Sequence, residues 1–175
     1  SLHYMLLDTI VMRSSAEGAP LYATKAVDPI IINAGDGAHE HPTQALLDMF
    51  SIIERKGSLE GKKVVLVGDI MHSRVARSDV YGLTKMGADV HLAGPRTMLY
   101  PELEKMGVTI HHDVREAVKD ADVVNVLRIQ LERIHSALYP TNREYARIFG
   151  INKDVLSLAK DDVMVMHPGP MNRGL

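Results

Sequence analysis

The sequence has no cysteine and no tryptophan among its 175 residues. The lack of cysteine excludes a disulfide scaffold, a thiolate-ligated zinc site, an iron–sulfur cluster and a thiol nucleophile. A surplus of charge of one sign is also lacking, because 20 basic residues stand against 22 acidic residues and the formal net charge is −2. A general nucleic-acid binder needs excess lysine and arginine to neutralise phosphates, so we expect no nucleic-acid partner.

Long apolar runs are missing as well. No unbroken apolar stretch approaches the ~20 residues that a membrane-spanning helix needs. The opening residues, SLHYMLLDT, have neither the basic start nor the small-residue cleavage site of a signal peptide. We therefore expect a cytoplasmic globular protein with no membrane partner, built as one domain or as two small lobes.

Short β-branched runs alternate with helix-length amphipathic stretches along most of the chain. This alternation is typical of βαβ units and predicts an α/β fold, in which a parallel sheet carries helices on both faces. The predicted strands are 10–12, 29–32, 63–67, 89–92, 108–111, 122–127 and 163–166. The predicted helices are 19–26, 42–55, 74–86, 100–106, 115–119, 143–149 and 153–159. The polar segment ERKGSLEGKK after the longest predicted helix favours a lobe boundary, with that helix crossing between two lobes.

Arginines follow the ends of three predicted strands, at Arg13, Arg74 and Arg128. Ligands of open α/β sheets bind beyond the carboxyl ends of the strands, so we expect these guanidinium groups at one edge of the sheet. Arginine binds carboxylate and phosphate oxygens in bidentate fashion and keeps its charge. A surface ion pair explains any one of the three equally well, but their recurrence predicts a small ligand, or a pair of ligands, with several negative charges.

The segment HPTQ, residues 41–44, has the pattern of a helix start. Pro42 suits the first turn, and Gln44 lies close enough to help satisfy free backbone N–H groups. Such a helix start also favours an anion. A neutral His41 donating to a carbonyl oxygen, with the Gln44 oxygen accepting from an NH2 group, would recognise an amide-like group attached to a phosphate. Helix capping and ligand recognition both stay open for these residues.

The segment GDIMHSR, residues 68–74, follows a strongly predicted strand, where a dinucleotide-binding protein carries G-x-G-x-x-G. Only the first glycine position is filled, so we predict no nicotinamide cofactor. Arg77 lies three residues after Arg74 and shares its helix face, but a solvated position is the better interpretation of Arg77.

Four segments together resemble one known family. NAGDGAHEHPTQALLD, GDIMHSRVARS, VLRIQLER and MHPGPMNRG occur in the order found in the catalytic chain of the aspartate carbamoyltransferase family. The resemblance implies the two-lobed transcarbamoylase fold. It also implies attack of the L-aspartate amino group on the carbonyl carbon of carbamoyl phosphate, giving N-carbamoyl-L-aspartate and phosphate in de novo pyrimidine biosynthesis, with no cofactor and no metal.

The resemblance assigns roles to particular residues. Arg13 and His41 match catalytic residues that act on the carbonyl and phosphate oxygens of carbamoyl phosphate, and Gln44 matches the residue that binds its amide. The residues matching the aspartate site are Arg74, Arg128, Gln130, Pro168, Gly169 and Pro170. The resemblance also implies a homotrimer with shared active sites, with regulatory or pathway chains as further candidate partners.

The same resemblance divides the chain into residues 1–41, a partial carbamoyl-phosphate-binding lobe, 42–56, a connecting helix, and 57–175, the aspartate-binding lobe. Most of the first lobe is expected to be missing, because the family's Ser-Thr-Arg-Thr phosphate loop and its lysine-bearing loop have no counterpart. The closing C-terminal helices are expected to be missing too. We therefore expect this chain by itself to bind carbamoyl phosphate poorly and to turn over little.

Two alternatives remain. An ornithine-type or other transcarbamoylase would share the fold, although ornithine-specific relatives typically carry a cysteine in the turn where this chain has HPGP. A noncatalytic domain that retains the fold would share the motifs without the activity.

Overall fold

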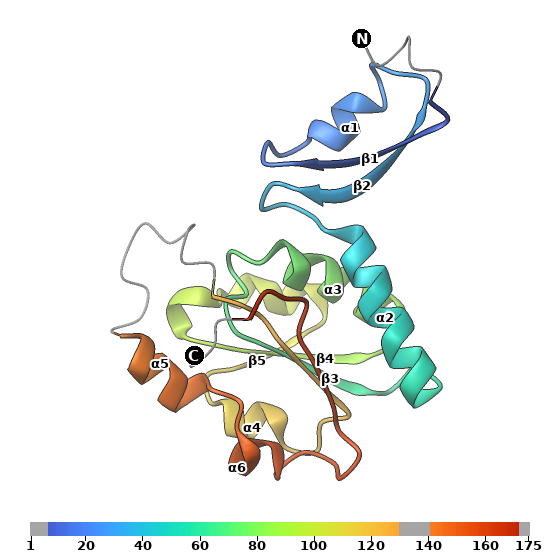
Figure 1. The fold of residues 1–175 in the computed structure, drawn as a ribbon. Helices are drawn as coiled ribbons and strands as arrows, with labels where there is room; N and C mark the ends of the chain where they lie inside the picture. Colours follow the sequence, from blue (N-terminus) through green and yellow to red (C-terminus); the bar gives the residue numbers. More distant parts are fainter. Residues whose placement is uncertain (1–6, 130–140, 172–175) are drawn as a thin grey trace.

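The structure is a computed structural model that describes residues 7–129 and 141–171. In these residues the strands form two separate parallel sheets, one of two strands and one of five (Figure 1). The smaller sheet belongs to an N-terminal lobe and the larger sheet to a C-terminal lobe, with a long helix between them. The α/β class with parallel sheets, predicted from the alternation of strands and helices, is confirmed.

The N-terminal lobe pairs β1 (Thr9–Ser14) with β2 (Ile30–Asp36). The short helix α1 (Ala19–Ala23) connects the two strands and packs against the sheet. On the other face Val11, Ile30 and Ile32 stay exposed to solvent in the described part of the chain. One side of this sheet is therefore partly buried against α1, and the other is an uncovered apolar face.

Helix α2 (Pro42–Lys56) leads from the N-terminal lobe into the C-terminal lobe. It begins with a proline in its first turn and ends at Gly57, whose φ of 79° is the left-handed conformation that stops helices. It packs mainly against α3 (Arg74–Lys85) and makes fewer contacts with β2. No helix in the described residues is long and apolar enough to cross a membrane.

The five-stranded sheet has the order β5-β4-β3-β6-β7, with every pair parallel. Its strands are β3 (Lys63–Val67), β4 (Asp89–Ala93), β5 (Thr109–His111), β6 (Val123–Val126) and β7 (Met164–Met166). The chain adds β4 and β5 on one side of β3 and then returns to place β6 on the other side. The direction of winding thus reverses between β3 and β6, which is where open α/β sheets bind ligands.

Alternate residues of β3 enter two hydrophobic layers, as strand geometry requires. Val64 and Leu66 pack with α2, α3 and the 3-10 helix η3 (Pro101–Met106), while Val65 and Val67 pack with helices on the opposite face. Those helices are α4 (Val114–Val118), α5 (Asn142–Phe149) and α6 (Lys153–Leu156). The larger sheet therefore carries helices on both faces, as predicted.

The structure differs from the sequence prediction in three details. The predicted helix 100–106 is a 3-10 helix over Pro101–Met106 rather than an α-helix, and 3-10 geometry is common in short helical connectors. A further short 3-10 helix, η2 (Arg96–Met98), has no counterpart in the prediction. The strand that carries Arg13 also lies in a different sheet from the strands before Arg74 and Arg128, because α2 carries the chain away from the first sheet.

The close approach of β3 and β6 at their carboxyl ends gives a stability prediction. Gly68 has a φ of 133°, and a Cβ there would overlap the carbonyl oxygen of Leu127, whereas the corresponding position at Gly107, with a φ of 79°, is open space. We expect Gly68→Ala to lower the free energy of unfolding by about 2–4 kcal/mol, because strain and overlap add. Gly107→Ala should cost only about 1 kcal/mol, for the backbone conformation alone. Urea unfolding of both variants measures the difference, and equal losses would contradict the importance of this contact.

Candidate active site

The predicted site residues come together at the junction of the two lobes. A cavity of about 500 Å³ is lined by Arg13, His41, Gln44, Ser73, Arg74, Val75, Arg128, Pro168, Gly169 and Pro170. Every site residue predicted from the sequence that lies within the described part of the chain is among them. Gln130 lies outside the described residues.

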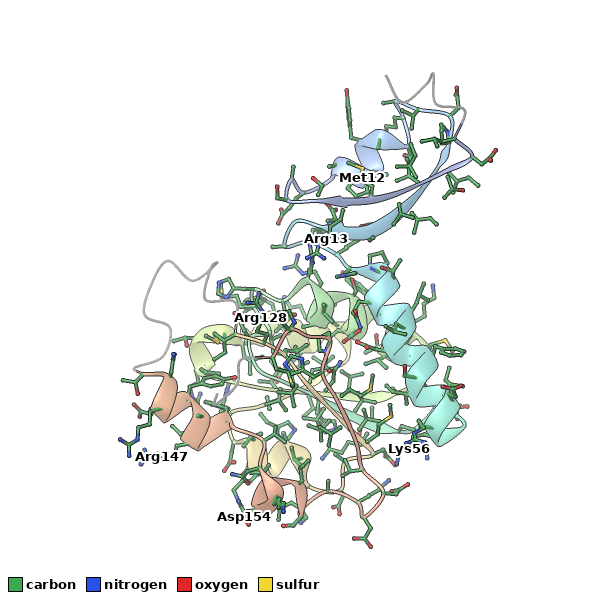
Figure 2. All side chains as sticks on the ribbon, viewed as in Figure 1. Met12, Arg13, Lys56, Arg128, Arg147 and Asp154 are labelled. Carbon is green, nitrogen blue, oxygen red and sulfur yellow. The ribbon has the colours of Figure 1, made fainter. Side chains whose placement is uncertain are left out.

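Both lobes contribute to the cavity. Arg13 comes from β1 in the N-terminal lobe, whereas Arg74 follows β3 and Arg128 follows β6 in the C-terminal lobe. Figure 2 shows Arg13 at the edge of the N-terminal lobe that faces the C-terminal lobe, with Arg128 near the opposing edge. The expectation of a single sheet edge is thus replaced by two sheets whose ends face each other.

Arg74 is buried where the lobes meet. Its Nη1 donates a hydrogen bond to the Gly37 carbonyl oxygen at 3.0 Å, although Gly37 belongs to the loop after β2. A Cβ on Gly35 would lie 3.0 Å from the Arg74 Cζ, so the glycine at this position leaves room for the guanidinium. Arg74 therefore joins the lobes as well as lining the cavity, which the sequence did not indicate.

The loop between β3 and α3 holds Arg74 in place. Ser73 caps α3, accepting a hydrogen bond from the Ala76 N–H at 3.1 Å. The Asp69 carboxylate, fully buried, accepts from the backbone N–H of His72 at 3.1 Å and lies 2.8 Å from its Nδ1. Side-chain hydrogen bonds thus shape this loop where a dinucleotide-binding protein would use further glycines.

His41 is the residue before the first turn of α2, and its backbone N–H donates to the Ser78 Oγ at 2.9 Å. Burial, the positive charge of Arg74 and that of Arg13 lower the pKa of the His41 ring. The imidazole is therefore neutral near neutral pH and carries one N–H. Its Nδ1 lies 3.4 Å from the Thr43 Oγ1, so a hydrogen bond donated by this hydroxyl would leave the N–H at Nε2.

Gln44 does not cap the helix. Its Nε2 donates to the Asp48 Oδ1 at 2.9 Å, one turn further along α2. The prediction that Gln44 helps satisfy free backbone N–H groups is therefore wrong, because its amide is bonded to the Asp48 side chain and the start of α2 has no side-chain cap. The Oε1 atom takes no part in this hydrogen bond, and the side chain lines the cavity.

The turn after β7 completes the cavity. Gly169 adopts a φ of 68°, its N–H donates to the His167 Nδ1 at 2.8 Å, and the Gly169–Pro170 peptide is cis. Burial and the neighbouring charge of Arg128 lower the pKa of His167. The proline-rich turn and Arg128 thus lie close together, as the order β3-β6-β7 in the sheet requires.

Sequence reasoning missed a buried group of polar residues beneath Gln44. Asp48, Asp79 and Asn125 come from α2, α3 and β6 and are all nearly inaccessible to solvent. The available signal was weak, because Asn125 merely interrupts an apolar run and Asp48 follows Gln44 at helical spacing. A separate cavity of about 510 Å³ adjoins Arg128 and His167, but its lining is mostly apolar and does not suit a polyanionic ligand.

The described residues contain no cluster of three or more histidine, aspartate or glutamate side chains placed to hold a metal ion.

The charge environment of His41 gives a prediction that NMR can test. Removing a neighbouring positive charge makes protonation of the ring less costly, so Arg74→Gln and Arg13→Gln should each raise the His41 pKa. Arg74→Gln should have the larger effect, because Arg74 has the larger electrostatic influence on the ring. His167, whose pKa depends on burial and Arg128, is the internal control and should not respond to Arg13→Gln. An unchanged His41 pKa in both variants would refute this geometry.

Comparison with known proteins gives two family matches that together span nearly the whole chain. Residues 60–175 match the model described as "Aspartate/ornithine carbamoyltransferase, Asp/Orn binding domain". Residues 1–54 match the model described as "Aspartate/ornithine carbamoyltransferase, carbamoyl-P binding domain".

Curated relatives point to the same family. The aspartate carbamoyltransferase catalytic subunit of Desulforamulus reducens is 57% identical over 175 residues, which is all of this chain and 56% of that protein. The corresponding subunit of Geotalea daltonii is 62% identical over 169 residues, 96% of this chain and 54% of that protein. The chain thus spans about half the length of the curated relatives it matches.

Solved structures of similar fold include both branches of the family. Aspartate transcarbamoylase from Trypanosoma cruzi, in complex with carbamoyl aspartate and phosphate, matches with a TM-score of 0.83 and 31% identity over 96% of this chain and 56% of that chain. Ornithine carbamoyltransferase from Pyrococcus furiosus matches with a TM-score of 0.79 and 32% identity over 97% of this chain and 56% of that chain. Sequence and fold agree, and the chain belongs to the aspartate/ornithine carbamoyltransferase family.

Proposed function

We propose that this chain is part of a catalytic subunit that transfers the carbamoyl group of carbamoyl phosphate to the amino group of L-aspartate. The observation that carries the proposal is the cavity between the lobes, to which a chain of net charge −2 contributes Arg13, Arg74 and Arg128. The two substrates together bring a phosphate and two carboxylates. Fixed guanidinium groups match that charge and the planar geometry of its oxygens.

At one end of the cavity, we assign carbamoyl phosphate to Arg13, His41 and Gln44. The Arg13 guanidinium would bind phosphate and carbonyl oxygens. The neutral ring of His41 would donate its N–H to the carbonyl oxygen, where negative charge develops during attack. The Oε1 of Gln44 would accept a hydrogen bond from the carbamoyl NH2 group, because its Nε2 is held by Asp48.

At the other end, we assign the carboxylates of L-aspartate to Arg74 and Arg128. Gln130 and the turn formed by Pro168, Gly169 and Pro170 would line the same pocket. Alignment of the amine with the carbonyl carbon would then provide much of the rate enhancement, with the donors around the oxyanion adding to it. No covalent intermediate is needed, and the departing phosphate is a suitable acceptor for the amine proton.

The second substrate distinguishes aspartate from ornithine transfer. The fold does not decide between them, since an ornithine carbamoyltransferase matches with a TM-score of 0.79. Two arginines on the second-substrate side suit a dicarboxylate, and the curated relatives at 57% and 62% identity are aspartate carbamoyltransferase catalytic subunits. Both observations support L-aspartate.

Assembly into a homotrimer with shared active sites is part of the proposal. Support comes from exposed apolar side chains on α2 and on the N-terminal sheet, because contiguous apolar surface of this kind is typical of protein–protein contacts. The exposed large apolar residues of α2 are Leu46, Leu47, Phe50 and Ile53. The N-terminal sheet adds Val11, Ile30 and Ile32. Regulatory or pathway partner chains and a cytoplasmic location stay predictions.

Binding of a bisubstrate compound tests the assignment of the site. N-(phosphonacetyl)-L-aspartate, the compound in one of the Trypanosoma cruzi structures, combines a phosphonate with two carboxylates. In calorimetric titrations Arg128→Ala should weaken its binding roughly 10- to 100-fold, the size expected for lost charge-assisted hydrogen bonds. The matched control is Arg147→Ala, an exposed arginine on α5 that does not line the cavity, and it should bind as the parent chain does. Equal binding by both variants would refute the site.

Turnover tests the choice of substrate. With carbamoyl phosphate supplied, the protein should carbamoylate L-aspartate in preference to L-ornithine, because Arg74 and Arg128 offer no partner for the side-chain ammonium of ornithine. The measurement is the ratio of carbamoyl-aspartate to citrulline formed from an equimolar mixture of the two amino acids. Citrulline as the main product would show the ornithine-type alternative to be correct. Because this chain by itself is expected to turn over little, the preference is measured as the ratio of the two products and not as their amount.

A further inference from the structure

A buried cluster of two carboxyl groups and one amide lies behind Gln44, away from the surface of the cavity. Asp48 of α2, Asp79 of α3 and Asn125 of β6 are 5%, 0% and 2% exposed. Burying ionised carboxylates without a compensating partner is costly, so such a cluster calls for a physical explanation.

Hydrogen bonds connect the cluster to Gln44. The Asn125 Nδ2 donates to the Asp48 Oδ2 at 3.3 Å and to the Asp79 Oδ2 at 3.2 Å, so one amide bridges both carboxyl groups. The other Asp48 oxygen, Oδ1, accepts from the Gln44 Nε2 at 2.9 Å. The path from Asp79 to the cavity therefore runs through Asn125 and Asp48 to Gln44.

Two neighbouring buried carboxylates do not both ionise readily, because each charge raises the cost of the other. Burial, the charge of Asp48 and a hydrogen bond to Asp48 raise the pKa of Asp79 well above its usual range. Burial also raises the pKa of Asp48, but hydrogen bonds with Gln44, Asn125 and Asp79 oppose that rise. Of the two carboxyl groups, Asp79 is thus the one that holds a proton more readily, and Asp48 is the one that ionises more readily.

Asp48 on α2 and Asp79 on α3 form the pair of carboxyl groups. The polar side chains that bond to them are Gln44 from α2 and Asn125 from β6. Among the described residues, no basic side chain is one of the main influences on either carboxyl. A proton, rather than a salt bridge, is therefore what reduces the charge of this cluster.

Unsatisfied atoms agree with a shared proton. The Asp79 Oδ1 and the Asn125 Oδ1 are buried without a hydrogen-bond partner among the described residues. With both carboxyl groups ionised, the cluster would hold many acceptors and only the N–H groups of Asn125 and Gln44 as donors. A proton on Asp79 supplies the missing O–H donor.

We propose that protonated Asp79, with Asn125 and ionised Asp48, forms a proton-sharing cluster that positions Gln44 by holding its Nε2, so that its Oε1 faces the cavity. Asp48 and Asp79 are positioning residues that touch no substrate. The choice of the carbamoyl NH2 group as the partner of Oε1 rests on the proposed function, whereas the protonation and the orientation do not. Loss of the Asp79 proton at alkaline pH would place two charges side by side and loosen Gln44.

NMR of the chain tests the protonation without any ligand. The carboxyl carbon of Asp79 should report a protonated group at neutral pH and titrate at alkaline pH, and this signal should vanish in Asp79→Asn. Asp79→Asn keeps the shape and an N–H donor, so the Gln44 side-chain amide should keep its shift and its protection from exchange. Asp154→Asn, at an exposed position on α6, is the matched control and should leave both signals unchanged. An Asp79 carboxyl that is ionised at neutral pH overturns the proposal.

Variants of Asp48 test the positioning. Asp48→Ala should expose the Gln44 amide to rapid exchange, and Asp48→Asn, which keeps an acceptor oxygen for Nε2, should restore most of its protection. Unchanged Gln44 exchange in Asp48→Ala overturns the proposal. If Asp48→Ala does not fold, the comparison of Asp48→Asn with the parent chain still decides, because loss of the Asp48 charge should make the Asp79 titration shift toward lower pH.

Carbamoyl phosphate binding connects the cluster to the proposed function. Its dissociation constant should rise roughly tenfold in Asp48→Ala, the effect of losing the orientation of one hydrogen-bonding group. Binding to the parent chain should weaken at alkaline pH, and that weakening should be absent in Asp79→Asn. Absence of carbamoyl phosphate binding in the parent protein would refute the proposed function and leave the NMR result standing. Alkaline weakening that persists in Asp79→Asn would overturn the role of the cluster in binding.

Discussion

The buried guanidinium of Arg74 is the interaction on which the shape of the cavity depends. Arg74 is the first residue of α3 in the C-terminal lobe, yet its Nη1 donates a hydrogen bond to the Gly37 carbonyl oxygen of the N-terminal lobe at 3.0 Å. The loop after β2 can accept it because Gly35 has no Cβ to fill the same space. An always-charged group is thus fixed between the lobes, and Arg13 and Arg128 lie around the same opening. The cavity is a property of the junction and of neither lobe alone.

Concentrated positive charge has consequences for the ionisable groups beside it. Burial, Arg74 and Arg13 all disfavour the protonated form of His41, and the neutral ring still carries one N–H that can be donated. Behind Gln44 the constraint is reversed, since Asp48 and Asp79 are buried and no cation among the described residues is a main influence on their pKa values. The protonation state of each group follows from its neighbours, so the site presents defined donors and acceptors before any ligand binds.

The sheet topology and the position of the arginines both fit the aspartate/ornithine carbamoyltransferase family. The winding of the larger sheet reverses between β3 and β6, and the loops that follow these strands carry Arg74 and Arg128. The same architecture serves aspartate and ornithine enzymes, as the similar TM-scores of 0.83 and 0.79 indicate. We therefore expect the choice of second substrate to come from the few side chains at the strand ends, and the proposed role of Arg74 and Arg128 favours a dicarboxylate.

The sequence by itself determined the order and type of almost all elements, because apolar periodicity, Pro42 and Gly57 act over a few residues. It also indicated the arginines after three strands and the neutral donor at His41. Tertiary structure alone decided that β1 and β2 form a separate sheet, that Arg74 joins the lobes, and that the Gln44 amide bonds to Asp48 instead of capping its helix. Asn125 lies 77 residues from Asp48 and 46 from Asp79, so no local pattern could reveal their contact. Strand pairing and shared burial are long-range properties, and they set which polar groups meet and in which direction their pKa values shift.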